Sequence, residues 1–414
     1  MPIGVADRLG SLRRLGRELW SGGRGPVLAA VAGGWFLSLG VRMIYPAVLP
    51  QLREAYTLDL TTAGLLITAL WVAYALGQLP GGILDDWLGG GRTLVASTVV
   101  SALALAFVVV ADSVAVLFGA TLLFGFATAL YGVARFTILT TTYPERGGTA
   151  IGLTMAAGDL GNSLLPPLAG ALAVALAWQL GFGLAIPLLV VAAVGIHVVV
   201  PSDASDSRPE ADATGDGANS RGAFDTIRRI GGALWRRPVA LVVAIQTLSY
   251  CVWQAFTGFY PTYLVEVKEL APTTSTVLFG GFFALGILVK PLAGSAYDAR
   301  GLRRVLPVVL VALTASLVAL PLVDGLVGII AVTALASSLL GYGTITLTYL
   351  TDAFPDDVQG TGLGALRTGY MLVGAGSPTV MGALADMGYF DEAFFLLAGV
   401  GAVTAVLSVL VPEG

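Results

Sequence analysis

Long apolar stretches recur about twelve times along the chain, and each is long enough to cross a bilayer as a helix. About twenty apolar residues span the ~30 Å hydrocarbon core, where only helices and closed barrels satisfy every backbone polar group. Of the residues, 56% are hydrophobic and only 12% are charged, whereas soluble domains have about 25% charged residues. The sequence therefore predicts an all-α, multi-pass membrane protein. Its twelve spans are expected at 27–48, 61–84, 93–111, 114–140, 148–175, 178–200, 238–264, 272–297, 303–323, 326–351, 361–386 and 391–412.

Basic residues set the predicted topology, because cytoplasmic loops of membrane proteins carry an excess of Lys and Arg. With the N-terminus inside, sixteen arginines fall on the cytoplasmic side, and only Arg53 and Lys268 fall outside. We therefore expect both termini in the cytoplasm, and the protein in the cell membrane. Residues 1–25 predict an amphipathic segment on the inner membrane surface. Two six-helix bundles, 26–200 and 238–414, are separated by 201–237, a cytoplasmic linker predicted to be acidic and disordered and then amphipathic.

The two halves share a motif that recurs after 212 residues. "GILDDWLGGGR" in the first half and "GSAYDARGLRR" in the second both read G-x3-D-x2-G-x2-R. The same shift aligns the fifth predicted span with the eleventh, so the chain reads as a duplicated six-helix unit. The motif residues are Gly82, Asp86, Gly89 and Arg92 in the first copy, and Gly294, Asp298, Gly301, Arg303 and Arg304 in the second.

This organisation resembles the major facilitator superfamily of secondary transporters, whose two pseudo-symmetric six-helix bundles are joined by a long cytoplasmic loop. The resemblance covers nearly the whole chain, and the repeated loop is its most specific marker. The family pattern there is G-x3-D-[RK]-x-G-x-[RK]-[RK]. The first copy departs from it, because Trp87 and Gly91 stand at positions that are usually basic. By this resemblance, the motif residues form a cytoplasmic gate that opens and closes as the halves rock.

Five charged residues lie inside predicted spans, and four of them are basic. Each charge costs roughly 2.5–3.5 kcal/mol at mid-helix on insertion scales, so such residues face the bundle interior, pair with one another or meet a charged substrate. An uncompensated positive cavity favours an anion, because a low dielectric strengthens the attraction and an arginine fork matches a carboxylate or phosphate. The five are Arg42, Arg135, Asp159, Lys290 and Arg367.

The resemblance also implies which residues meet the solute, since spans one, four, seven and ten of the family line a central cavity. Asp159 is expected opposite Lys290 across the seam between the halves, as a candidate for proton coupling. A basic residue in both the eighth and the eleventh span is similar to the oxalate–formate antiporter branch of the family. The candidate substrate-binding residues are Arg42, Tyr45, Tyr131, Arg135, Gln246, Tyr250, Trp253, Gln254, Lys290 and Arg367.

The predicted function is secondary active transport of a small solute, an organic anion, by alternating access, with a proton or sodium ion as the coupling ion. The alternative is a multidrug/proton antiporter that exports lipophilic compounds, for which Asp159 would supply the acid. A receptor on a transporter scaffold is a third interpretation. The sequence offers no catalytic set for an enzyme, and its single His197 and single Cys251 exclude a histidine metal site and an intrachain disulfide. We expect a monomer without cofactor or nucleic-acid partner.

Overall fold

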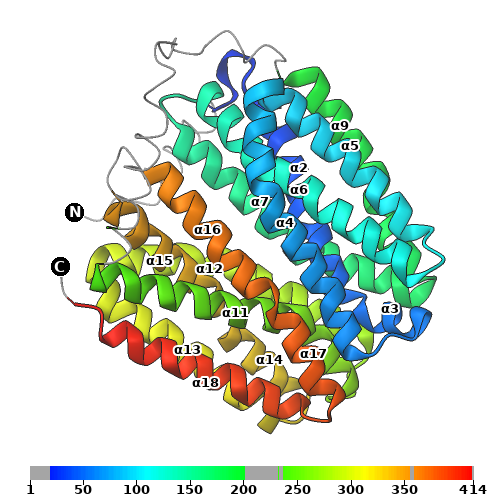
Figure 1. The fold of residues 1–414 in the computed structure, drawn as a ribbon, viewed down its shortest axis with the longest axis vertical. Coiled ribbons are helices and arrows are strands. Elements are labelled where there is room, and N and C mark those ends of the chain that lie inside the picture. The colour runs from blue at the N-terminus through cyan, green and yellow to red at the C-terminus, as the bar shows by residue number, and fades with distance from the viewer. Residues whose placement is uncertain (1–18, 201–231, 233–235, 355–358, 413–414) are drawn as a thin grey trace, which may run out of the picture.

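The computed structural model describes residues 19–200, 232, 236–354 and 359–412, which are helical almost throughout (Figure 1). Most of the predicted N-terminal surface segment and of the linker therefore lie outside the described residues. The first half comprises η1 (Ser21–Gly23), α2 (Gly25–Ala47), α3 (Leu49–Tyr56), α4 (Leu60–Leu88), α5 (Gly90–Val109), α6 (Val114–Thr142), α7 (Gly147–Ala175), α8 (Trp178–Gly183) and α9 (Ala185–Val199). The second half comprises α11 (Arg237–Glu266), α12 (Pro272–Arg300), α13 (Leu302–Leu322), α14 (Leu326–Ala336), α15 (Leu339–Ala353), α16 (Gln359–Ala375), α17 (Ser377–Asp386) and α18 (Phe390–Val409).

Every predicted span coincides with a helix or with two consecutive helices, which confirms the all-α membrane fold. The sixth, tenth and eleventh spans are each divided, as α8–α9, α14–α15 and α16–α17. Ten helical segments among the described residues are long and apolar enough to cross a membrane. The fifth and eleventh spans are not among these ten. Both are rich in glycine and contain proline.

The repeat found in the sequence has the same backbone geometry in both halves. Gly89 separates α4 from α5 with φ 80° and ψ 152°, and Gly301 separates α12 from α13 with φ 77° and ψ 166°. A positive φ of this size is strained for a residue with a Cβ, which explains why glycine ends the second span of each half. We call the end of the molecule that holds these two glycines the motif end.

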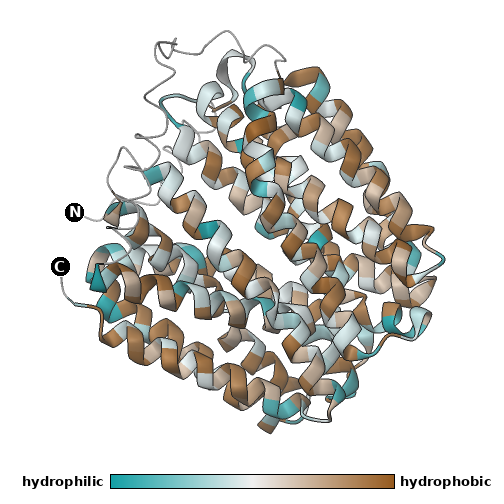
Figure 2. Ribbon diagram, in the orientation of Figure 1, coloured by the Kyte–Doolittle hydropathy of each residue, from teal (hydrophilic) through white to brown (hydrophobic). Residues whose placement is uncertain are grey.

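The halves meet along two seams, each formed by the second span of one half and the fifth span of the other. Helix α12 packs against α7, and α4 packs against α16 and α17. Hydrophobic residues predominate along the helices of both halves, as Figure 2 shows, and many of the large ones are exposed. Val191 and Val327, for example, are 70% and 82% exposed. That pattern suits helices surrounded by hydrocarbon rather than water.

Close helix contacts depend on glycine. A Cβ added at Gly161 of α7 would lie 2.1 Å from the backbone oxygen of Phe36 in α2. A Cβ at Gly382 of α17 would lie 2.0 Å from the backbone oxygen of Leu60. Small residues let membrane helices approach until dispersion forces hold them, because lipid supplies no hydrophobic drive for helices to associate.

We predict that Gly161→Ala destabilises the first half, because the new methyl group must push α2 and α7 apart. Overpacking of this kind costs about 1–3 kcal/mol. Thermal unfolding of the detergent-purified protein measures the effect as a lower midpoint. Gly152→Ala on the same helix is the matched control, since a Cβ there meets no atom within 4 Å. Equal midpoints for the two variants would contradict a packing role for Gly161.

Candidate functional site

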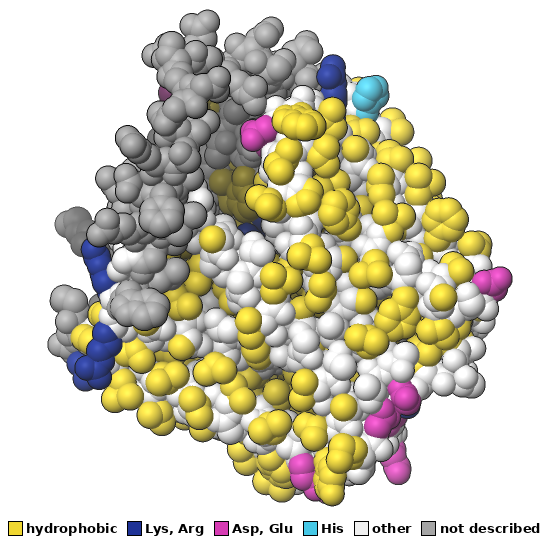
Figure 3. All heavy atoms as spheres, viewed as in Figure 1, with side chains coloured by type: hydrophobic (Ala, Val, Ile, Leu, Met, Phe, Trp, Pro, Cys, Tyr) yellow, Lys and Arg dark blue, Asp and Glu magenta, His cyan; other side chains and the backbone are white. Residues whose placement is uncertain are grey.

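A cavity of about 230 Å³ lies between the two halves, and six of the predicted site residues line it. Helices α2, α4 and α7 contribute one wall, and α11, α12, α15 and α16 contribute the other. Figure 3 shows the surface hollowed between the halves, beside the residues drawn in grey. The six predicted residues are Asp159, Gln246, Tyr250, Trp253, Lys290 and Arg367.

An ion pair crosses the seam at the edge of this cavity. The Nζ atom of Lys290 in α12 donates to Oδ1 of Asp159 in α7 at 2.6 Å. The lysine side chain remains 33% exposed and the aspartate side chain 12% exposed. Each charge therefore has a partner from the other half, yet the ammonium group can still be reached from the cavity.

Two arginines lie deeper, stacked on aromatic rings of the first half. The guanidinium carbon of Arg42 lies 4.0 Å from the ring centre of Tyr74 and 5.2 Å from that of Trp71. The guanidinium carbon of Arg135 lies 3.5 Å from the ring centre of Trp35. Both arginines are 1% exposed, and neither lines the cavity. The stacking faces attract the cations through the ring quadrupoles but carry no compensating charge.

The buried positive charge is incompletely neutralised. Arg42, Arg135 and Arg367 all lie within electrostatic range of Tyr74. Each has at least one buried guanidinium nitrogen without a hydrogen-bond partner. Within the described ranges, none of the three forms an ion pair with a carboxylate. A positive cluster that the protein itself leaves unpaired is suited to receive an anion.

Aromatic rings form a continuous path from the first half to the second. Trp71 of α4 meets Trp253 of α11 edge to face at 5.4 Å between ring centres. Trp253 stacks on Tyr250 at 5.5 Å, and Tyr250 meets Tyr370 of α16 at 5.0 Å. These rings give the cavity apolar walls. Gln246, held by the hydroxyl of Thr346 at 2.6 Å, adds a polar group to them.

Three predicted site residues have other surroundings. Tyr45 packs edge-on against Phe182 at 4.7 Å, inside the first half. Tyr131 donates its hydroxyl to the backbone oxygen of Val31 at 2.8 Å, which ties α6 to α2. Gln254 is fully buried, and both of its amide atoms lack a partner among the described residues. None of the three lines the cavity.

Sequence reasoning missed the aromatic partners of the cations. Trp35, Trp71, Tyr74 and Phe136 are large aromatic residues in helices, and such residues are common in any membrane bundle. A detectable signal was available at Trp35, which precedes Arg42 by seven residues, or about two helical turns. That spacing places the two side chains on one face of α2.

The motif residues lie at the ends of their helices, where Asp86, Arg92, Asp298, Arg303 and Arg304 are exposed. Next to them, Asp85 accepts a hydrogen bond from the hydroxyl of Thr137 in α6 at 2.6 Å. This contact joins the second and fourth spans within the first half.

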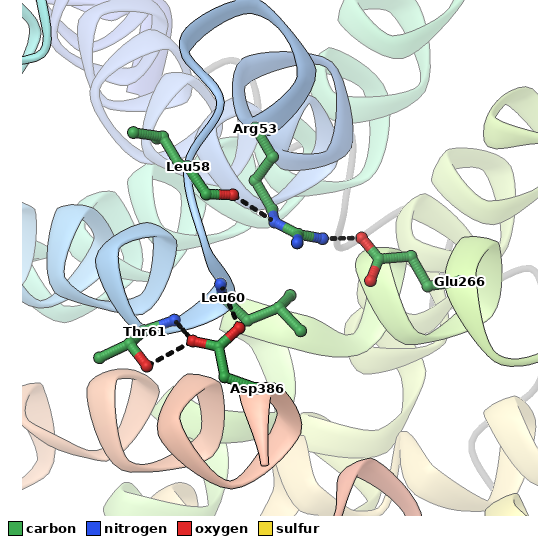
Figure 4. Close-up of polar contacts among 6 residues, drawn as sticks. All are labelled: Arg53, Leu58, Leu60, Thr61, Glu266 and Asp386. Atoms are coloured by element: carbon green, nitrogen blue, oxygen red, sulfur yellow. Dashed lines mark hydrogen bonds and ion pairs between the residues drawn. The ribbon is translucent and has the colours of Figure 1, made fainter. Parts of the chain in front are cut away.

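At the opposite end, polar contacts fasten one half to the other (Figure 4). Asp386 of α17 accepts hydrogen bonds from the backbone N–H groups of Leu60 and Thr61 at 2.8 Å and 2.7 Å, and from the hydroxyl of Thr61 at 2.5 Å. The carboxylate thus caps the N-terminus of α4, where orphan N–H groups and the helix dipole favour negative charge. Arg53 forms an ion pair with Glu266 beside it. We call the four residues Asp386, Thr61, Arg53 and Glu266 the latch.

The latch and the cavity lie at different depths. One turn or more below the latch, Thr68 of α4 and Thr379 of α17 share a hydrogen bond of 2.8 Å. Lys290 lies eleven residues before Gly301 along α12, on the motif side of that helix's midpoint. The described halves are therefore joined at the latch end, and the cavity lies toward the motif end.

Comparison with known proteins agrees with this architecture. The sequence profile of the Major Facilitator Superfamily matches residues 30–375 and, in a second match, residues 242–413. The chain is 26% identical over 382 residues to a protein named hexuronate transporter from Bacillus subtilis (strain 168), covering 87% of this chain and 88% of that protein.

Solved structures share the fold at low sequence identity. A bacterial homolog of the human lysosomal transporter Spinster, in an inward-facing and occupied conformation, has a TM-score of 0.76 and 15% identity over 94% of this chain and 96% of its own. A D-xylose-proton symporter has a TM-score of 0.73 and 12% identity over 94% and 97% of the two chains. Together with the profile match over most of the sequence, the helices and the duplicated loop lead to one conclusion: this multi-pass protein of the cell membrane belongs to the Major Facilitator Superfamily of transporters.

Proposed function

We propose that the protein carries a small organic anion across the membrane by alternating access, and that the anion is a sugar acid of the hexuronate type. The observation that carries the proposal is the unpaired arginine cluster beside the cavity. Arg42, Arg135 and Arg367 form no ion pair with a carboxylate of the described residues, and each has a buried guanidinium nitrogen without a partner among them. A bound carboxylate offsets this charge in a low dielectric, where the attraction is strong. The hexuronate transporter of Bacillus subtilis adds support.

The cavity walls suit the rest of such a molecule. Trp71, Trp253 and Tyr250 present ring faces and edges that can pack on the C–H groups of a sugar ring. Gln246 and Asn162 provide amide groups for its hydroxyls. Apolar walls with a few placed polar groups are the common composition of small-molecule sites.

Lys290 and Asp159 connect binding to movement in this proposal. The substrate carboxylate draws Lys290 away from Asp159, which leaves a carboxylate near the membrane interior. The freed Asp159 is the proposed binding site for the coupling proton. Substrate and proton therefore cross together, and the seam is released for the halves to rock. The latch holds the cavity closed at one end while it is reached from the other.

Neutralising the ion pair separates a substrate-binding role from a structural one. We expect Lys290→Ala to abolish glucuronate uptake into proteoliposomes, since the substrate loses a charge partner. The double variant Lys290→Ala, Asp159→Asn removes both charges and with them the cost of an unpaired buried carboxylate. We expect it to be inactive as well. Uptake restored in the double variant would mean that the pair only stabilises the fold. Lys268→Ala, at the latch end and outside the cavity, is the control that should keep its uptake.

Ligand-induced thermal stabilisation distinguishes the anion carrier from a multidrug exporter, which the aromatic walls also fit. A ligand at 100 times its Kd stabilises the native state by about 2.7 kcal/mol. We expect glucuronate to raise the melting temperature of the purified protein, glucose to have little effect, and Arg367→Gln to erase the glucuronate shift. Stabilisation by tetraphenylphosphonium alone would favour the exporter.

Removing the latch should shift the protein toward the state open at the latch end. A hydrogen bond to a charged group contributes about 1.5–3 kcal/mol, so Asp386→Ala is expected to change the equilibrium at least about tenfold. The measurement uses a reporter cysteine in the cavity, Gly343→Cys, in a protein whose native cysteine is removed by Cys251→Ala. An impermeant thiol reagent is supplied from the motif side, and the rate at which it labels the reporter is recorded. Labelling should slow in the variant.

Asp391→Ala is the matched control for that experiment. Asp391 lies near the same end but accepts its hydrogen bond from Tyr263 of its own half, at 2.6 Å. Its loss should leave the labelling rate unchanged. Equal rates in the Asp386 variant and in the unmodified reporter protein would rule out a conformational role for the latch.

A further inference from the structure

A second cavity, separate from the transport site, opens at the motif end of the second half. It has a volume of about 420 Å³ and lies where α12 ends, α13 begins and α18 ends. Its lining includes three arginines and two tyrosines, namely Arg300, Arg303, Arg304, Tyr297 and Tyr349.

The first half has a corresponding cavity in the equivalent position. It measures about 280 Å³ and is lined by Arg92 at the start of α5 and by His197 and Val200 at the end of the sixth span. The 212-residue shift that relates the two halves aligns Arg92 with Arg304 and Val200 with Pro412, and both partners line the second-half cavity. The duplicated unit therefore carries this cavity in both copies.

The two copies differ in charge. The first-half cavity has one arginine and the single histidine, whereas the second-half cavity has three arginines. Asp298 and Asp352 lie within electrostatic range of Tyr297, but neither lines the second-half cavity. Arg303 has an interaction of its own, which leaves Arg300 and Arg304 as the arginines that can offer their charge to a ligand in the second-half cavity.

Directly beneath the arginines, the surface becomes apolar and faces outward. Val308, one to two turns into α13, is 67% exposed, and Leu410, next to the cavity residue Val411, is 53% exposed. Helices α13 and α18 pack against each other, and each has an exposed apolar side chain close in sequence to a residue that lines the cavity. A basic rim above an apolar, membrane-facing surface has the polarity of a phospholipid with its headgroup and acyl chains.

We propose that the second-half cavity binds the headgroup phosphate of an anionic phospholipid, with the acyl chains lying along α13 and α18. Arg300 and Arg304 hold the phosphate, and the tyrosine hydroxyls of Tyr297 and Tyr349 complete the polar rim. The predicted topology places this end at the cytoplasmic leaflet, where anionic lipids attract juxtamembrane basic residues. The first-half cavity, with a single arginine, binds such a lipid more weakly. This proposal is independent of the transported solute.

Native mass spectrometry of the full-length protein tests the proposal by counting bound dioleoylphosphatidylglycerol. Each basic residue near a membrane surface contributes about 1 kcal/mol, so Arg300→Gln and Arg304→Gln should each weaken lipid binding about fivefold, and the double variant about 25-fold. Lys268→Gln, which removes one positive charge at the latch end of the same half, is the control that should bind as the unmodified protein does. Gel filtration and thermal unfolding verify that each variant is folded.

Two further arms identify the ligand. Dioleoylphosphatidylcholine, whose headgroup is neutral overall, should bind at least about fivefold more weakly than the anionic lipid, by the same charge argument. Inorganic phosphate at millimolar concentration should not displace the bound lipid. Displacement by phosphate would identify a site for soluble anions and overturn the lipid assignment. Equal lipid retention by the double variant and the unmodified protein would overturn the site itself.

Discussion

The structure depends on how positive charge is held inside a low-dielectric bundle. An isolated cation at mid-membrane costs several kcal/mol, and an ion pair with a carboxylate usually reduces that cost. Lys290 forms such an ion pair with Asp159. Arg42 and Arg135 instead receive aromatic faces, which stabilise a cation without neutralising it. The difference leaves the centre of the molecule electrically positive while its helices remain packed.

Close packing makes that arrangement possible. Gly161 and Gly382 allow backbones of neighbouring helices to touch, which leaves the large aromatic residues free to surround the cations instead of filling gaps between helices. The two seams are built in the same way, since the second span of each half packs against the fifth span of the other. In the proposed alternating access, rocking would exchange contacts at one end of the seams for contacts at the other.

Much of the fold could be predicted because apolar length and the repeat are properties of the sequence itself. The two loop glycines, Gly89 and Gly301, were identifiable from spacing alone, and both adopt positive φ. The site was harder to predict. The predicted spans identify which residues lie in the membrane. The rotation of each helix about its axis then decides what each of those residues faces. Tyr45 and Tyr131 turn into the first half, whereas Tyr250 lines the cavity, and helical periodicity in a bundle that is apolar on all sides does not distinguish them.

The composition of the latch links the working of the carrier to the salt content of its surroundings. The side chains of Arg53 and Glu266 are 20% and 31% exposed, so dissolved ions reach their pair and screen it. The cap that Asp386 places on α4 is exposed as well, and the attraction between a carboxylate and a helix N-terminus is also screened by salt. Rising ionic strength therefore weakens both parts of the latch. The strength with which the latch joins the two halves becomes a graded function of the salt concentration around it.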